Sequence, residues 1–352
     1  MGSELKDNIL VWLPSPMGDV ILCTPALRAI RRRFESAKIT LFGSPVVHQV
    51  LTPSGFADSW LEQNGGVLAA ARMLKSHNFT QAVLFKNSFG SALACFLARI
   101  PVRIGYSREG RGILLTERLY PPRLSLGGFK PISMVDYYLA IASRLGADVQ
   151  DRAIVLAIEP KDAETIRAKL PGVLNCGGPV VILVPGAAAG PSKRWPADRF
   201  AKVADWLISN YNATVVLSVA PNTDEKRIAE QIVNTTSHRL VNLGETPISL
   251  GELKALYADA DLVIGNDTGP RHIAIGLKRK VITLVGPNNP AWTDPGYADE
   301  VFVKGEVSCA PCNKPVCGKP VQLCMDAITI EMVCKAAAAA LNAAGSGKRG
   351  GI

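Results

Sequence analysis

The feature that most constrains this chain is an alternation of short apolar runs, loops and amphipathic helical segments that occurs twice. Apolar runs at 9–13, 39–42 and 82–85 predict strands in the first half, and runs at 180–184, 214–218, 262–264 and 281–285 predict strands in the second half. Repeated strand–loop–helix units are typical of parallel sheets with helices on both faces. We therefore expect an α/β protein with two such domains that face one another across a cleft, with ligands at the carboxyl ends of the strands.

A polar stretch that contains Pro and Gly, from 159 to 179, separates the two sets of strands. It places one domain at 1–160 and the other at 161–342. The final residues, 343–352, contain little that could be buried, so we expect them to form a disordered tail. Within the first helical segment, Thr24 and Pro25 suit an N-cap and a first helical residue, which predicts that the helix restarts there.

Composition limits the class of protein and its partners. The net charge of +9 lies mainly in residues 1–170, which fits an anionic partner, either nucleic acid or a phosphate-rich membrane surface, although a solvated basic surface is an equal alternative. Aromatic residues make up only 6% of the chain, which disfavours single-stranded nucleic-acid binding by stacking. No apolar run is long enough to span a membrane, and no signal peptide is recognisable, so we expect a cytoplasmic protein.

Two common nucleotide-binding motifs are missing. The first strand is not followed by G-x-G-x-x-G, and the segment Gly190-Pro-Ser-Lys193 does not match the phosphate-binding loop of nucleoside triphosphatases. A nicotinamide dehydrogenase and a phosphate-loop triphosphatase are both disfavoured.

Asp19 follows the first predicted strand and its turn. A carboxylate there could act as a general base that takes the proton of an attacking hydroxyl. It could equally cap the helix that follows, because carboxylates favour exposed amide groups at helix N-termini.

Two loops of the second half suit phosphate. Gly186 and Gly190 allow backbone amides to approach an anion, and Lys193 adds a compact positive charge, although a surface lysine beside a packing tryptophan is an equal alternative. The loop 265–272 joins a buried strand to a helix, whose first amides are unpaired and bind phosphate readily. Within it, Asp267 could cap the helix or hold a ribose or sugar hydroxyl, and His272 could donate to phosphate or be a core histidine.

Four cysteines lie close together near the C-terminal end, at Cys309, Cys312, Cys317 and Cys324. Their type and number would suit zinc, but the spacing is not that of a common zinc ribbon. Reduced, buried thiols are the alternative, and the site prediction contains no metal.

Taken in order, several short motifs resemble the ADP-heptose:lipopolysaccharide heptosyltransferases of glycosyltransferase family 9, from about residue 9 to residue 333. The motifs are Met17-Gly18-Asp19-Val20, Pro185-Gly186, Lys193-Arg194-Trp195-Pro196, Asn266-Asp267-Thr268-Gly269 with His272, and Gly286-Pro287. Segments at 87–93, 100–106 and 244–246 are similar to the second heptosyltransferase of core assembly rather than the first.

The resemblance implies two Rossmann-like domains of the GT-B architecture, with acceptor binding at 1–160 and donor binding at 161–342. Asp19 falls at the general-base position, and Lys193 falls where the family neutralises the diphosphate leaving group. The implied donor-binding residues also include Gly186, Glu225 near the adenosine ribose, Asp267, Thr268, Gly269 and His272. Asn87 and Ser88 are expected to contact the acceptor.

The implied reaction is an inverting transfer of heptose from ADP-heptose to the inner core of lipopolysaccharide, on an acceptor of the heptosyl-Kdo2-lipid A type. No cofactor is expected, since positive groups of the protein meet the leaving diphosphate. Expected partners are the donor, the anionic glycolipid and the inner-leaflet membrane surface, with no nucleic acid. The alternatives are a nucleotide-sugar epimerase, another GT-B enzyme with a different donor or acceptor, and a non-catalytic nucleic-acid-binding protein, which would bind with a steep salt dependence.

Overall fold

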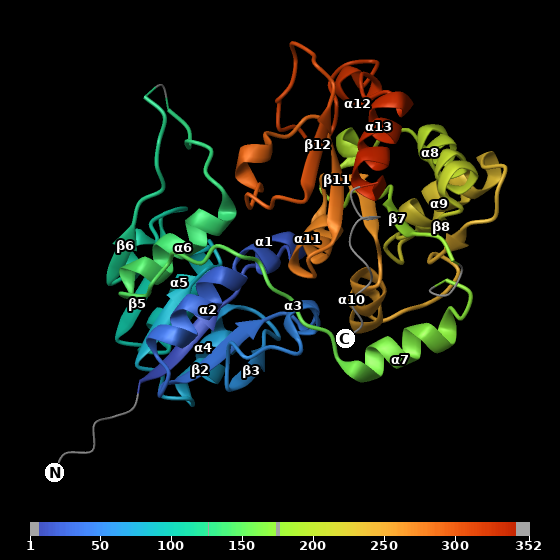
Figure 1. Ribbon diagram of the computed structural model, residues 1–352. Coiled ribbons are helices and arrows are strands. Elements are labelled where there is room, and N and C mark those ends of the chain that lie inside the picture. The colour runs from blue at the N-terminus through green and yellow to red at the C-terminus, as the bar shows by residue number, and fades with distance from the viewer. Residues whose placement is uncertain (1–6, 126, 174–176, 343–352) are drawn as a thin grey trace. The chain divides into compact units, whose positions relative to one another are not determined.

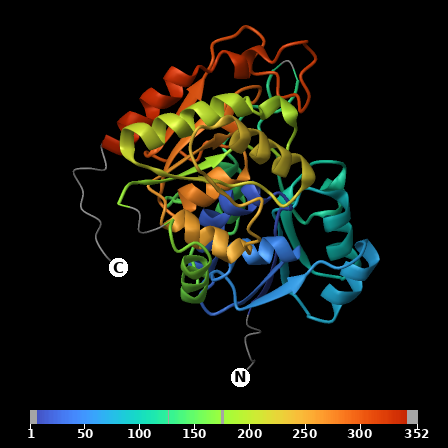
Figure 2. The ribbon, with the colours of Figure 1, turned by 90° about the vertical axis from the view of Figure 1, so that its right-hand side faces the viewer.

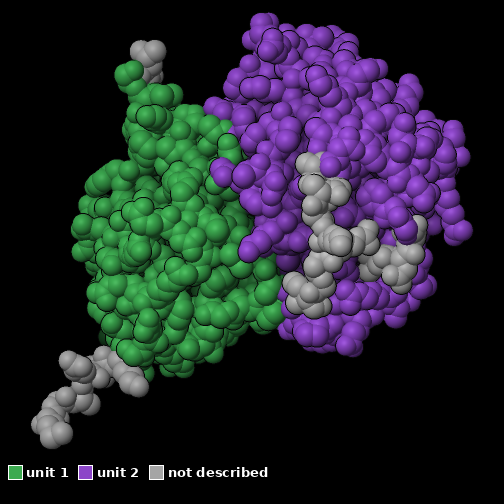
Figure 3. All heavy atoms as spheres, in the orientation of Figure 1, with its two compact units in different colours: residues 1–157, 291–295 green, residues 158–290, 296–352 purple. Residues whose placement is uncertain are grey.

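The computed structural model describes residues 7–125, 127–173 and 177–342, and the chain divides into two compact units (Figure 3). Unit 1 consists of residues 1–157 and 291–295, and unit 2 of residues 158–290 and 296–352. The short return of the chain to unit 1 at 291–295 was not expected from the sequence. The predicted tail, 343–352, lies outside the described residues, and the assignment of acceptor and donor binding to 1–160 and 161–342 stays a prediction.

Unit 1 is built on a six-stranded parallel sheet with the order β3-β2-β1-β4-β5-β6. Its central strand β1 is buried from Ile9 onward and pairs with β2 on one side and β4 on the other. The strands are β1 (Asn8–Trp12), β2 (Lys38–Gly43), β3 (Ser59–Glu62), β4 (Gln81–Leu84), β5 (Val102–Tyr106) and β6 (Glu117–Leu119).

Unit 2 repeats this topology with the strand order β12-β11-β10-β7-β8-β9. Numbered from the start of each unit, both sheets have the Rossmann order 3-2-1-4-5-6. The expectation of two Rossmann-like α/β domains is therefore confirmed. The strands are β7 (Val180–Val184), β8 (Thr214–Leu217), β9 (Val241–Asn242), β10 (Leu262–Asn266), β11 (Lys280–Val285) and β12 (Glu300–Lys304).

Helices cover both faces of each sheet (Figure 1). In unit 1, α4 and α5 pack on a core that contains Leu10, Trp12 and Phe42, while α1, α2 and α6 pack together on the opposite face. The bounds are α1 (Met17–Leu22), α2 (Thr24–Arg33), α3 (Pro45–Leu51), α4 (Val67–Lys75), α5 (Phe89–Leu97), α6 (Met134–Arg144) and the 3₁₀ turn η1 (Arg111–Leu114).

In unit 2, α8, α9 and α13 cover one face of the sheet, around a core with Trp195 and Phe200, and α10 and α11 cover the other (Figures 1 and 2). The bounds are α7 (Pro160–Lys169), α8 (Ala197–Tyr211), α9 (Thr223–Thr235), α10 (Leu250–Ala258), α11 (Gly269–Gly276), α12 (Leu323–Asp326) and α13 (Ile330–Asn342), with the 3₁₀ turn η2 (Pro191–Lys193). The 3₁₀ turn η3 (Pro290–Trp292) begins at the last residue before the chain returns to unit 1.

The predicted restart of the first helix is confirmed, but its cap is not Thr24. Helix α1 ends at Leu22, Cys23 is the N-cap of α2, and Thr24 is already helical. The Thr24 hydroxyl donates instead to the carbonyl of Ile21, at 2.8 Å. Pro25 lacks an amide proton, so it fits only within the first turn of a new helix.

Within the part of the chain that the structure describes, none of the helices combines the length and the apolar character that crossing a membrane would require.

The close approach of β7 and β10 gives a testable consequence. A Cβ atom added to Gly265 of β10 would lie 2.6 Å from the Cβ of Val184 in β7. Both strands are central in the sheet and cannot move apart without breaking their ladder. We expect Gly265→Ala to lower the free energy of unfolding by about 1–3 kcal/mol, measured by chemical denaturation.

Gly172→Ala is the matched control, because a Cβ atom there meets nothing within 4 Å. Equal stabilities of the two variants would contradict the tight packing of β7 against β10.

Candidate active site

The predicted site residues of unit 1 follow two neighbouring strands. Asp19 lies in α1, after β1, and Asn87 and Ser88 follow β4, which pairs with β1. The helices after these strands, α1 and α5, pack on different sets of helices, on opposite faces of the sheet. Connections that leave in opposite directions part from one another and open a crevice at the strand ends, where ligands bind in sheets of this kind.

Unit 2 repeats this arrangement. Gly186 and Lys193 follow β7, and the loop from Asp267 to His272 follows β10, the strand paired with β7. Glu225 lies one strand further along the same edge, after β8. In each unit the sequence thus identified the two loops at the point where the crossovers change direction.

Asp19 is the third residue of α1 and is half-buried. Its carboxylate makes no hydrogen bond or ion pair within the described residues, and α1 has no side-chain cap. Burial raises the pKa of Asp19 to about 6. The helix-capping alternative is therefore not supported, and the unpaired carboxylate, still ionised at neutral pH, has the basicity that a general base needs.

Asn87 and Ser88 are held by the protein itself. The Asn87 Oδ1 atom accepts hydrogen bonds from Arg111 Nη2 at 2.8 Å and from the Tyr137 hydroxyl at 3.1 Å. Ser88 Oγ accepts from the amide of Ser91 and caps α5. These bonds leave the Asn87 amide nitrogen as the group that can meet a ligand.

Arg111 is a residue that sequence reasoning missed. It is fully buried, and it also donates to the backbone oxygens of Tyr106, at 2.8 Å, and of Lys86. Burial lowers the pKa of this guanidinium to about 10, so it stays charged at neutral pH. Nothing near Arg111 in the sequence distinguishes it from the surface arginines of unit 1.

In unit 2, Gly186 lets a carboxylate approach the backbone. A Cβ atom at Gly186 would lie 2.1 Å from Glu225 Oε2. Glu225 is buried near the start of α9, where its Oε2 accepts from the amide of Ala220 at 2.8 Å and its own amide donates to Asn222. Glu225 thus stands beside the backbone of the loop that leads to Lys193.

Lys193 binds the loop after β10. Its ammonium lies 3.1 Å from Asp267 Oδ2 and 3.0 Å from the Asp267 carbonyl oxygen. Asn266 joins the same two loops, since it accepts from the amide of Trp195 at 3.1 Å and donates to the carbonyl of Pro185 at 2.7 Å. An ammonium has three protons, so Lys193 keeps one for a ligand.

One alternative for Asp267 was that it caps α11, and this alternative is wrong. The N-cap is Thr268, and the Asp267 carboxylate binds Lys193 and, at 2.9 Å, Arg271 Nη1. Burial would raise the pKa of Asp267, but the charges of Arg271 and Lys193 outweigh it and lower the pKa. Asp267 therefore stays ionised and orients the two cations.

Sequence reasoning left the role of Arg271 open, and it did not identify the other residues of this cluster. Arg271 is almost fully buried, and its Nε lies 3.5 Å from Glu300 Oε1, which in turn accepts from the hydroxyl of Thr283 at 2.6 Å. Asn288 Nδ2 donates to Asp267 Oδ2 at 3.1 Å. Glu300 and Asn288 belong to β12 and to the loop after β11, far from Asp267 in sequence.

Thr268 and Gly269 begin α11, which has eight residues and a proline in its first turn. The Thr268 side chain makes no capping bond, so it does not occupy the positive end of the helix. His272 is buried, and burial followed by the charge of Arg271 holds its pKa well below the usual value. His272 is therefore neutral, but a neutral imidazole keeps one N–H donor, and its Nδ1 atom is buried without a hydrogen-bond partner in the described residues, so donation to phosphate stays a prediction.

The cysteine-rich segment binds the loops after β7 and β11. Pro315 O accepts from the amide of Ser192 at 3.2 Å, and Pro287 O accepts from the amide of Cys312 at 2.9 Å. In the described residues, no three His, Cys, Asp or Glu side chains converge into a group that could hold a metal ion. Cys309, Cys312, Cys317 and Cys324 are all free thiols.

The fold agrees with that of solved glycosyltransferase structures. The structure of Escherichia coli ADP-heptose lipopolysaccharide heptosyltransferase II matches with a TM-score of 0.78 and 24% identity, over 96% of this chain and 100% of that chain. The structure of a family 9 glycosyltransferase from Veillonella parvula matches with a TM-score of 0.80 and 22% identity, over 96% of this chain and 97% of that chain. The chain therefore has the GT-B glycosyltransferase fold.

Sequence comparison gives the family. The model of glycosyltransferase family 9 (heptosyltransferase) matches residues 67–321, more than two thirds of the chain. Lipooligosaccharide heptosyltransferase 2 of Haemophilus influenzae is 28% identical over 312 residues, which is 82% of this chain and 86% of that protein. The chain belongs to glycosyltransferase family 9, and it is a glycosyltransferase rather than an epimerase or a non-catalytic binding protein.

The ion pairs of Asp267 with Lys193 and Arg271 predict a pH-dependent contribution to stability. We expect Asp267→Asn to lower the free energy of unfolding by about 3 kcal/mol at neutral pH, because the buried Arg271 and the partly buried Lys193 each lose a carboxylate partner. The lowered pKa means that this contribution is complete above the unfolded value of 3.8 and is lost as the pH falls through the folded value. Denaturation curves at pH 7 and pH 3 measure the difference.

Asp224→Asn is the control, since the Asp224 side chain is 76% exposed and its oxygen lies 3.7 Å from Arg194. Exposed pairs contribute little. If Asp267→Asn were as stable as Asp224→Asn at pH 7, the buried pair would not stabilise unit 2.

Proposed function

We propose that this enzyme transfers heptose from ADP-heptose, with inversion, to the inner core of lipopolysaccharide, on an acceptor of the heptosyl-Kdo2-lipid A type. The observation that carries the proposal is the cluster in which Lys193 and the start of α11 meet at the ends of β7 and β10. An ammonium group beside a helix N-terminus would bind the diphosphate of the donor. The names of the relatives, heptosyltransferases that act on lipopolysaccharide or lipooligosaccharide, support the sugar and the acceptor.

Unit 2 would bind the donor. Lys193 has one proton left after its two bonds to Asp267, and this proton would meet the diphosphate, together with the amides at Thr268 and Gly269. Gly186 brings the backbone of the same loop to Glu225, which would accept from the ribose hydroxyls. The strand order puts Glu225 at β8, on the far side of β7 from Asp267, as a nucleotide lying along the edge requires.

Unit 1 would supply the base and part of the acceptor site. Asp19 would take the proton of the attacking acceptor hydroxyl, a role that suits an unpaired carboxylate with a pKa of about 6. The Asn87 amide nitrogen, oriented by Arg111 and Tyr137, would donate to an acceptor oxygen, and the Ser88 hydroxyl lies next to it in the chain.

The reaction would be a single displacement. The acceptor oxygen forms a bond to the anomeric carbon as the bond from that carbon to the phosphate oxygen breaks, so the configuration inverts. The proton goes to Asp19, and ADP leaves with the electron pair. Lys193 and the α11 amides stabilise the charge that develops on ADP, so the proposed mechanism uses no cofactor and no divalent cation.

Such an enzyme would work in the cytoplasm, at the inner face of the membrane. A surface of unit 1 has the chemistry for this contact. Phe96 of α5 is 49% exposed, and the Arg103 guanidinium lies 5.6 Å from its ring centre. Arg103 also binds the carbonyl of Leu114 at 2.6 Å, next to Ile113, which is 78% exposed. Exposed apolar side chains around an arginine suit an anionic lipid surface.

A donor screen with purified protein and heptosyl-Kdo2-lipid A tests the proposal. We expect the protein to transfer heptose from ADP-heptose. We also expect kcat/KM to fall as the pH drops below about 6, because Asp19 must be ionised to accept a proton. Asp19→Asn should lower kcat at least about a hundredfold while ADP binding is kept, measured by product formation and by calorimetry.

ADP binding by Asp19→Asn separates a base from a structural carboxylate. Loss of structure would weaken ADP binding as well as activity, whereas loss of a base would lower only the activity. Absence of any transfer from ADP-heptose by the wild-type protein would refute the proposed function. Full activity of Asp19→Asn would refute only the role of Asp19.

The membrane contact has its own test. Phe96→Glu with Ile113→Glu should weaken binding to vesicles that contain anionic lipid by about tenfold or more, since the substitution adds repulsion and removes apolar contact. Met332→Glu, on α13 of unit 2 and 37% exposed in the wild type, is the control. Co-sedimentation measures both, and equal binding of the two variants would place the contact elsewhere.

A further inference from the structure

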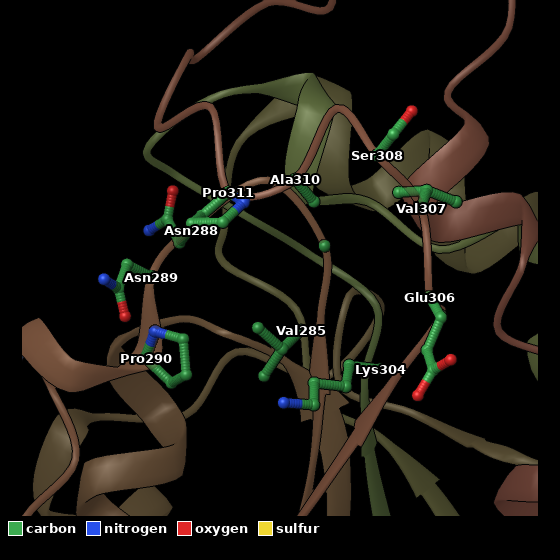
Figure 4. A pocket seen from close by; sticks show the side chains of 12 residues that line it. Val285, Asn288, Asn289, Pro290, Lys304, Glu306, Val307, Ser308, Ala310 and Pro311 are labelled. Atoms are coloured by element: carbon green, nitrogen blue, oxygen red, sulfur yellow. The ribbon is translucent and has the colours of Figure 1, made fainter.

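A cavity of about 740 Å³ lies in unit 2 at the carboxyl ends of β11 and β12 (Figure 4). None of the residues assigned to catalysis or to donor binding above lines it. Figure 4 shows Lys304 of β12 extending toward Pro290 across the space, with Asn288 and Pro311 on the far rim. The lining residues are Val285, Gly286, Asn288, Asn289, Pro290, Lys304, Gly305, Glu306, Val307, Ser308, Ala310 and Pro311.

The walls of this cavity are tied together by hydrogen bonds. Pro287 O accepts from the amides of Cys312 and Asn313, at 2.9 and 2.8 Å, and Asn313 Oδ1 accepts from the amide of Asn289 at 3.0 Å. The cysteine-rich segment therefore holds one wall against the loop after β11. Because hydrogen bonds hold its walls together, the cavity is formed before any ligand binds. A preformed site lowers the entropy cost of ordering the protein on binding.

The cavity begins next to Lys193 and Asp267, where the proposed function places the diphosphate. Asn288 lines it and also donates to Asp267 Oδ2 at 3.1 Å, and Lys193 binds the same carboxylate oxygen. Asn288 Oδ1 makes no hydrogen bond within the described residues. A ligand group that leaves the Lys193–Asp267 pair toward β11 meets Asn288 first.

The order of the strands indicates which part of the donor extends toward β11 and β12. Along the carboxyl edge, Glu225 follows β8, Lys193 follows β7, Asp267 follows β10, Asn288 follows β11 and Lys304 ends β12. In the proposed function, the ribose lies at β8 and the diphosphate at β7 and β10. The transferred sugar is attached to the other end of the diphosphate, so it continues toward β11 and β12.

The cavity's polar groups suit hydroxyls. Lys304 and Glu306 are exposed side chains of the lining and form no ion pair in the part of the chain that the structure describes. An ammonium donates to hydroxyl oxygens, and a carboxylate accepts from two neighbouring hydroxyls. Ser308 adds a further hydroxyl.

We propose that this cavity receives the exocyclic diol of the transferred sugar, through Asn288, Lys304 and Glu306, and so selects a heptosyl over a hexosyl donor. A heptose differs from the matching hexose by one carbon and one hydroxyl at this arm. The inference rests on the proposed function and adds the residues that determine donor specificity. A site that hydrogen-bonds a hydroxyl of the donor favours that donor over one that lacks the hydroxyl.

The test compares ADP-heptose with ADP-mannose, whose sugar lacks the seventh carbon, as donors for the wild type, Glu306→Ala, Glu306→Gln and Lys304→Ala. We expect each variant to lower kcat/KM for ADP-heptose by about tenfold or more and to change it little for ADP-mannose, so that the ratio of the two falls. Binding of ADP alone, measured by calorimetry, should not change, since ADP carries no transferred sugar.

Glu230→Ala on α9 and Lys202→Ala on α8 are matched controls, because both side chains are exposed in unit 2 and do not line the cavity. An unchanged ratio in all three cavity variants, with the wild type transferring heptose, would overturn this inference and leave the proposed function intact. Equal losses with both donors would also overturn it. A wild type that transfers from neither donor would remove the proposed function, and the inference with it.

Discussion

The site depends on a change of direction in each sheet. Two neighbouring parallel strands, β1 and β4 in unit 1 and β7 and β10 in unit 2, send their helices to opposite faces, so the loops after them part. The site residues predicted from the sequence, with the exception of Glu225, all follow one of these four strands, namely Asp19, Asn87, Ser88, Gly186, Lys193, Asp267, Thr268, Gly269 and His272.

Two aspartates at such strand ends have opposite electrostatic surroundings. Burial without a partner raises the pKa of Asp19, whereas for Asp267 the charges of Arg271 and Lys193 outweigh burial and lower it. An acid with a raised pKa can accept a proton near neutral pH, and an acid with a lowered pKa cannot. The same residue type thus serves as a candidate base in unit 1 and as a fixed counter-charge in unit 2.

The strands that sequence reasoning found are those buried on both faces. β1, β7, β10 and β11 are nearly continuous apolar runs, because helices cover both sides of the middle of a parallel sheet. The strands β3, β6, β9 and β12 lie toward the sheet edges, are short or partly exposed, and include polar residues. Such short or interrupted patterns are weak signals of a strand, so pairing with a neighbour is what identifies them.

The sequence by itself determined the α/β class, the two sets of strands and the loops that follow them, because strand burial and loop residues such as Gly186 and Asp267 leave local patterns. Tertiary structure alone decided which distant side chains meet there. Arg111 reaches Asn87, Asn288 reaches Asp267, and Glu300 reaches Arg271 only in the folded chain. The physical reason is that burial and charge act through space, while a sequence pattern records only neighbours along the chain.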